Sequence, residues 1–209
     1  MGYLKPFALL VIALCLSGPA VGADVFERAG KRHGVDANLL RSIAKQESQG
    51  HPWTLNFGGH SLYLPDRETM LRVFKASRDN PWLVTLSYKD GRPVRRVFFP
   101  SRKNGAAFRD HMKKQADVRN ARMTKLDILN VDIGLMQINW RWHKDKFPSV
   151  EAMGDVEGNV NYAAKYLAEL IREYGIIRGV GYYHHRKSTK RWKDYYRRIY
   201  HHYGTLTSG

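Results

Sequence analysis

Cysteine is nearly absent from this sequence of 209 residues, in which Cys15 is the single example. Cys15 lies in an apolar run near the N-terminus, so the remainder of the chain can form no disulfide. The alternative, a lipid-modified cysteine, is disfavoured because Leu14 stands where a small residue is usual. A chain of this length can build an ordinary hydrophobic core and does not need disulfides to fold.

Long hydrophobic runs are also scarce. The run at residues 7–16 is shorter than the ~20 residues that a membrane-spanning helix needs. Lys5 precedes it and the small residues 21–23 follow it, an order that is typical of a secretory signal peptide. The sequence therefore predicts a signal at residues 1–23, export to the periplasm, and a mature chain without a transmembrane segment.

Acidic residues are few relative to basic ones. The chain has 35 Lys and Arg against 19 Asp and Glu, a formal net charge of +16. Such a surplus favours a polyanionic partner, although a merely solvated basic surface has the same composition. Export and the lack of a recognisable reader motif argue against nucleic acid. An anionic cell-wall polymer or membrane surface fits better.

Internal repeats are absent, and the periodicity of apolar residues is mostly helical. It predicts two helices within residues 24–48, separated at Gly34, with Asp36 as the N-cap of the second. Further helices are expected at 67–77, 105–123, 155–175 and 188–203, with Gly175 ending the third of these. Residues 49–65 read as a loop, and residues 125–140 as a loop that leads into a short helix near Leu135.

One segment has a different pattern. Residues 81–100 contain two runs rich in Val, Leu, Tyr and Phe on either side of Asp90-Gly91, a strong hairpin signal. The predicted fold is therefore mainly α, of the α+β kind, with a small β-hairpin. No boundary in residues 24–209 demands a second domain.

A carboxylate completes an apolar helical stripe at Glu47. Leu40, Ile43 and Glu47 follow the spacing i, i+3, i+7, which places them on one helix face. Glu47 can lie in water at a frayed helix end, form a buried ion pair, or line a cleft as a carboxyl that desolvation keeps protonated. The third alternative would make it a general acid.

A second polar cluster follows in "VDIGLMQINW", residues 131–140. Gly134 permits close approach of a ligand or a neighbouring chain segment. Gln137 and Asn139 carry amides that suit sugar hydroxyls and N-acetyl groups, or that brace a turn. Asp132 is a candidate second carboxylate, although a turn or capping role is the preferred reading.

The order of these motifs resembles a known family. "ES" after an apolar helix, then "GLMQIN", then "NVNYAAKYL", then a tyrosine segment, is similar to the SLT-type, lysozyme-like lytic transglycosylases. Within this family, the sequence resembles the small exported enzymes that are associated with conjugation and with type IV and type III secretion systems. The resemblance implies a catalytic role for Glu47 and substrate-binding roles for Ser48, Gly134, Met136, Gln137, Asn139 and Tyr183. It also places Leu135 and Asn159 within the matched motifs.

Two departures from the family pattern stand out. "GYYHH" puts His184 where the family usually has Asn, so Tyr182 remains an alternative to Tyr183 as the cleft tyrosine. The distance in sequence from Glu47 to Gly134 is also long for the family. We therefore expect residues 24–209 to form one lysozyme-like catalytic domain with an insertion at about 58–129.

The resemblance implies cleavage of the MurNAc-GlcNAc bond of peptidoglycan by a single Glu, with formation of a 1,6-anhydro sugar and no cofactor. Two alternatives remain open: a lysozyme-type muramidase with the same Glu, and a basic wall-binding adaptor of a secretion machine. Secretion or conjugation components are possible partners. No metal is expected, because the pairs His184-His185 and His201-His202 have no acidic cluster beside them.

Overall fold

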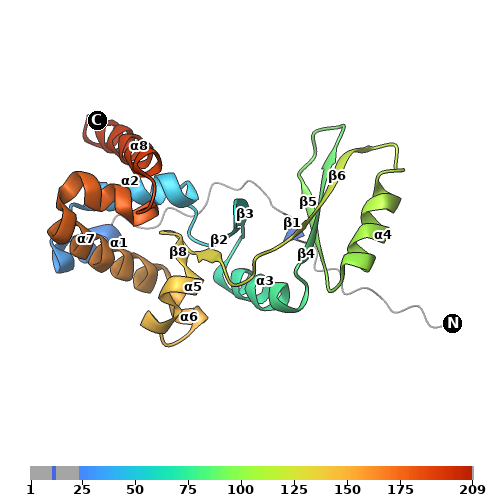
Figure 1. The fold of residues 1–209 in the computed structure, drawn as a ribbon, viewed down its shortest axis with the longest axis horizontal. Helices are drawn as coiled ribbons and strands as arrows, with labels where there is room; N and C mark the ends of the chain where they lie inside the picture. Colours follow the sequence, from blue (N-terminus) through green and yellow to red (C-terminus); the bar gives the residue numbers. More distant parts are fainter. Residues whose placement is uncertain (1–10, 13–23, 209) are drawn as a thin grey trace. The chain divides into compact units, whose positions relative to one another are not determined.

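The computed structural model describes residues 11–12 and 24–208 (Figure 1). Within this part of the chain, helices dominate and the strands form small antiparallel sheets. The prediction of a mainly α fold with small β elements is confirmed. The predicted signal peptide lies outside the described residues, apart from strand β1 (Val11–Ile12). No described helix combines the length and the apolarity that crossing a membrane requires.

The described residues group into two compact units. One consists of residues 55–131 together with β1, and the other of residues 24–54 and 132–208. The chain passes between them within strands β2 (Thr54–Phe57) and β7 (Val131–Ile133). The insertion expected at about 58–129 thus falls inside the first unit, which has a hydrophobic core of its own.

The first unit contains a sheet of order β1-β5-β4-β6. In it, β4 (Trp82–Tyr88) pairs with β5 (Arg95–Phe99) on one side and with β6 (Val118–Lys125) on the other. The hairpin predicted around Asp90-Gly91 is confirmed, because β4 and β5 pair antiparallel on either side of it. The helix α4 (Arg102–Met112) packs on one face of the sheet. The core between them contains Val84, Leu86, Tyr88, Val97, Phe99, Val118 and Ala121, with Phe108 and Met112 against it.

Two segments of this unit differ from the sequence-based expectation. The helix predicted over 105–123 ends at Met112, and its second half is strand β6, which satisfies its backbone by pairing with β4. The loop predicted over 49–65 contains strands β2 and β3 (His60–Tyr63). They flank Gly58 and Gly59, both at positive φ, which is the geometry of a tight hairpin turn. The helix α3 (Arg67–Asp79) follows as predicted, capped by Asp66.

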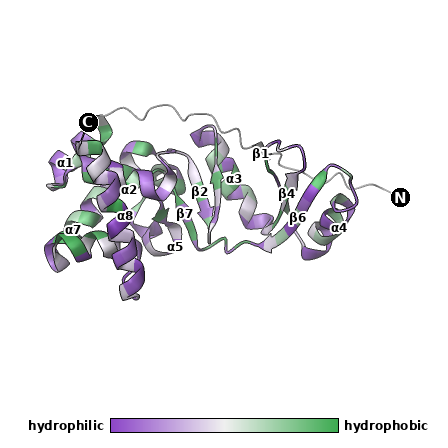
Figure 2. Cartoon of the chain, turned by 90° about the horizontal axis from the view of Figure 1, so that it is seen from above, coloured by the Kyte–Doolittle hydropathy of each residue, from purple (hydrophilic) through white to green (hydrophobic). Residues whose placement is uncertain are grey.

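The second unit is a bundle of helices with one short hairpin of β7 and β8 (Ile138–Asn139). Helix α8 packs against α2 and α7, and α1 packs against α2 and α7. Figure 2 shows hydrophobic and hydrophilic residues side by side along these helices, as expected when one face of each is buried. The helices are α1 (Asp24–His33), α2 (Ala37–Ser48), α5 (Trp140–His143), the 3-10 turn η1 (Lys144–Lys146), α6 (Val150–Met153), α7 (Val156–His184) and α8 (Thr189–Thr207).

The predicted helix ends are largely confirmed in this unit. Gly34 separates α1 from α2 at φ 69°, and Asp36 caps α2 by accepting a hydrogen bond of 2.8 Å from the Leu39 N–H. Gly175 breaks the helical path at φ 75° and ψ 164°, as its predicted role as a helix end requires. The chain then continues in a second helical piece to His184, which the sequence pattern did not indicate.

Candidate active site

Glu47 lies on the buried face of α2. Leu40 and Ile43 on the same stripe are completely buried, and the Glu47 side chain is 13% exposed. Its Oε1 atom is enclosed and has no hydrogen-bond partner among the described residues. The alternative of a frayed helix end in water is therefore excluded, and Glu47 is a largely desolvated carboxyl.

His184 and Tyr195 lie beside this carboxyl. His184 Nδ1 is 3.6 Å from Glu47 Oε1, and the imidazole stacks on the Tyr195 ring at 4.7 Å between centroids and an interplanar angle of 4°. Tyr195 is fully buried. Burial, and then the nearby Glu47 carboxylate, raise the pKa of Tyr195 well above its usual value, although its hydroxyl does not reach hydrogen-bond geometry with Glu47.

The "GLMQ" motif forms the turn of the β7–β8 hairpin. Asp132 pairs with Asn139 and Ile133 with Ile138, which leaves residues 134–137 as the connecting turn. The helix predicted near Leu135 is therefore wrong, because α5 begins only at Trp140. The motif is a fixed backbone turn and not the start of a helix.

The side chain of Asn159 holds this turn from α7. Its Oδ1 accepts a hydrogen bond of 2.8 Å from the Met136 N–H, and its Nδ2 donates to the carbonyls of Ile133 and Met153 at 3.0 and 2.9 Å. Asn159 is completely buried, so these bonds face no competition from water. This explains why the asparagine that begins the "NVNYAAKYL" segment accompanies the turn motif.

Gly134 is required by two features of the turn. Its φ is 83°, a conformation that residues with a side chain rarely adopt. A Cβ at this position would also lie 2.7 Å from Asn159 Nδ2, which is closer than nonbonded atoms allow. The glycine therefore permits the amide of Asn159 to approach the turn.

Gly134→Ala is expected to destabilise the fold by about 2–4 kcal/mol, since it adds a steric clash to the cost of a positive φ. Gly50→Ala is the matched control, because Gly50 has φ 80° and open space around it. We expect the control to lose only about 1 kcal/mol. Denaturant unfolding of both variants measures the difference, and equal losses would show that the contact with Asn159 contributes nothing.

Ser48, Met136 and Gln137 support the turn and do not face an open cleft. Ser48 Oγ is 2.7 Å from the Leu135 carbonyl and 3.0 Å from the Ala44 carbonyl, and both Ser48 and Met136 are completely buried. Gln137 Nε2 donates to the Gly134 and Thr54 carbonyls at 2.8 and 3.2 Å. All three residues are buried, and the hydrogen bonds of Ser48 and Gln137 hold the turn. The substrate-binding roles predicted for them stay a prediction.

Tyr183 reaches the same turn from α7. Its hydroxyl donates to the Met136 carbonyl at 2.9 Å. Burial, and then the Glu47 carboxylate, raise its pKa well above the usual value, so the phenol lies in the electrostatic environment of Glu47. Tyr182 instead packs edge-on against Tyr174 and Trp192. Of the two tyrosines left open by the sequence, the structure brings Tyr183 to the turn.

Asp132 lies in the electrostatic environment of Glu47, and it does not have the turn or capping role that its sequence context favoured. It lies within strand β7, not at a helix cap, and accepts a hydrogen bond of 2.7 Å from Asn139 Nδ2. Its pKa is raised to about 6, chiefly by burial and also by the Glu47 carboxylate, against the lowering effects of the hydrogen bond from Asn139 and of His184. The alternation Val-Asp-Ile was the signal that could have placed it in a strand.

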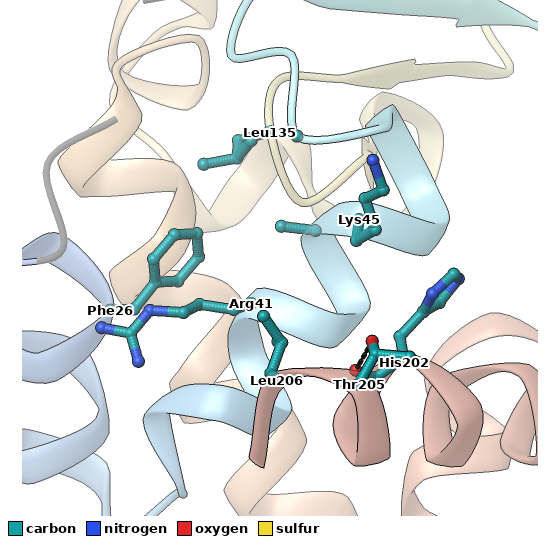
Figure 3. A pocket seen from close by; sticks show the side chains of 9 residues that line it. Phe26, Arg41, Lys45, Leu135, His202, Thr205 and Leu206 are labelled. Atoms are coloured by element: carbon teal, nitrogen blue, oxygen red, sulfur yellow. Dashed lines mark hydrogen bonds between the residues drawn. The ribbon is translucent and has the colours of Figure 1, made fainter. Parts of the chain in front are cut away.

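The second unit also has a pocket that does not include Glu47. It lies between α1, α2, the turn and the end of α8, and Figure 3 shows Lys45 of α2 among its lining residues. In the part of the chain that the structure describes, no group of three or more His, Cys, Asp or Glu side chains is arranged to hold a metal ion. The carboxylates and phenols around Glu47 are thus the chemically distinctive cluster.

A comparison with protein-family models gives one match. The family model "Transglycosylase SLT domain" matches residues 106–199. The match includes the turn 134–137, Asn159 and Tyr183, and it begins after Glu47 and Ser48. It supports a lytic transglycosylase that acts on peptidoglycan and an α+β, lysozyme-like fold. No curated protein and no solved structure matches the chain significantly.

Proposed function

We propose that this protein is an exported lytic transglycosylase that cleaves the β-1,4 bond between MurNAc and GlcNAc in peptidoglycan. The observation that carries the proposal is the enclosed Glu47 carboxyl, which lies beside a turn within the segment that the SLT family model matches. A carboxyl in such surroundings can deliver a proton to a glycosidic oxygen.

The proposed reaction uses Glu47 twice. Its carboxyl gives a proton to the leaving GlcNAc oxygen as the bond to C1 of MurNAc breaks, and the MurNAc N-acetyl group stabilises the positive charge at C1. The Glu47 carboxylate then takes the proton of the C6 hydroxyl as the bond from O6 to C1 forms. The product is a 1,6-anhydroMurNAc end, no water is consumed, and Glu47 is protonated again.

The other site residues take supporting roles in this proposal. Asn139 is half-buried and Tyr183 is partly exposed, so both retain surface for a sugar. Ser48, Gly134, Met136 and Gln137 position the turn through the contacts described above. In this proposal the turn beside Glu47 is a rigid support for the bound sugar.

A muramidase that uses water is the second candidate. Asp132 favours it, because a carboxylate near Glu47 could activate a water molecule or stabilise the positive sugar. A wall-binding adaptor is the third alternative, and the enclosed Glu47 argues against a purely inert one.

Location and partners are also part of the proposal. The N-terminal pattern supports export to the periplasm, and the family resemblance supports a role beside a conjugation or secretion apparatus. Residues 55–131 contain 16 Lys and Arg against 7 Asp and Glu, a net charge of 16 − 7 = +9. That charge suits an anionic wall polymer.

Mass spectrometry of the muropeptides released from purified sacculi tests the reaction. We expect predominantly anhydro ends, which weigh one water less than reducing ends, and we expect Asp132→Asn to leave this product unchanged. Predominantly reducing MurNAc, together with an inactive Asp132→Asn variant, would establish a two-carboxylate hydrolase instead.

A further inference from the structure

His184 stands beside Glu47 at a position where the resembling family usually has Asn. Its side chain is 48% exposed, whereas that of Glu47 is 13% exposed. The parallel stack on Tyr195 fixes the plane of the imidazole, and Nδ1 then lies 3.6 Å from Glu47 Oε1. An enclosed carboxyl therefore has a solvent-accessible base as its neighbour.

The charged and titratable groups around this pair come from four elements. In addition to Glu47 of α2, they are Asp132 of β7, Tyr183 and His185 of α7, and Tyr195 and Arg198 of α8. The Arg198 guanidinium lies 6.0 Å from the centre of the Tyr195 ring, on which His184 also stacks. The surroundings of the pair thus include the Asp132 carboxyl, two phenols and the Arg198 guanidinium.

We propose that His184 is a positioning residue that controls the proton on Glu47. This inference rests on the proposed function, in which Glu47 must carry a proton when the glycan binds. The proton transfer from the Glu47 carboxyl to His184 gives a carboxylate and an imidazolium, which attract each other at 3.6 Å. This ion pair is inactive, and the reactive form has the proton on Glu47 and a neutral His184.

The charge of the residue that replaces His184 should decide the direction in which the pH dependence of glycan cleavage moves. His184→Asn removes the cation, so Glu47 should keep its proton to higher pH. The midpoint of the basic limb of kcat/KM should then shift upward by about 0.5–1 pH unit. At a fixed pH on that limb, the variant should be about 3–10-fold more active than the wild type. His184→Lys keeps a cation throughout the neutral range and should shift the basic limb to lower pH.

His201→Asn is the matched control. His201 is an exposed histidine of α8, and its ring lies 6.0 Å from that of His202 between centroids. We expect its pH profile to coincide with that of the wild type. A purely structural role of His184 would lower activity at all pH values alike, and parallel profiles for the Asn and Lys variants would overturn the proposal.

A measurement without activity separates this inference from the proposed function. NMR titration of the imidazole of His184 should give a midpoint about 0.5–1 pH unit lower in Glu47→Gln than in the wild type, because the carboxylate no longer stabilises the imidazolium. The midpoint of His201 should not change. Equal His184 midpoints would refute the shared proton, even if glycan cleavage is established, and a shifted midpoint would support it even if no glycan is cleaved.

Discussion

Glu47→Gln is expected to lower the kcat of glycan-strand cleavage by roughly 10³–10⁴-fold. General acid–base help is worth roughly 10²–10⁴ in rate, and here one residue is proposed to serve first as acid and then as base. Gln has the same shape as Glu but carries no transferable proton. Initial rates of muropeptide release from purified sacculi measure the loss.

The fold should survive this substitution. Glu47 Oε1 makes no hydrogen bond within the described residues, so an amide at this position breaks none there. Glu157→Gln is the matched control, because Glu157 is 60% exposed and its ion pair with Arg28, at 3.3 Å, lies on the surface. We expect the control to retain full activity. A Glu47→Gln variant with more than a tenth of the wild-type rate would remove Glu47 from the catalytic role.

Local signals in the sequence were sufficient for most helices. Gly34 and Gly175 act through their own backbone geometry, and Asp36 acts through a side-chain hydrogen bond to Leu39, three residues later. Their positions could therefore be read without knowledge of the fold. The same holds for the β4–β5 hairpin around Asp90-Gly91. Local signals did not predict strand β6, because its strand conformation depends on pairing with β4, thirty or more residues earlier in the chain.

The candidate site could be predicted only in part, for a similar reason. The stripe of Leu40, Ile43 and Glu47 lies on one helix, and its spacing alone places the carboxyl on a buried face. His184 and Tyr195 reach Glu47 from two other helices, and no spacing rule connects them to it. For Ser48 and Met136, the motif does not tell whether the side chains face a ligand or brace the turn, and the structure shows both of them buried beside the turn.

Asp132→Asn is expected to stabilise the protein at neutral pH and to have little effect in acid. In the folded state the pKa of Asp132 is raised from 3.8 to about 6, chiefly by burial, so the native state binds this proton more tightly than the unfolded state does. Stability from this group is therefore fully present below about pH 4 and is lost as the pH rises through about 6.

Two pKa units correspond to about 3 kcal/mol, which bounds the free energy of unfolding that the wild type loses by pH 7.5. Asn avoids this loss because it stays neutral, and its side-chain oxygen can still accept the hydrogen bond from Asn139 Nδ2. Denaturant unfolding at pH 4 and pH 7.5 should show a gain for Asp132→Asn at the higher pH only. The exposed Asp145→Asn should show no such difference. An equal change at both pH values would mean that the buried charge of Asp132 does not destabilise the fold. The protein would then lose no stability by keeping a carboxylate near Glu47.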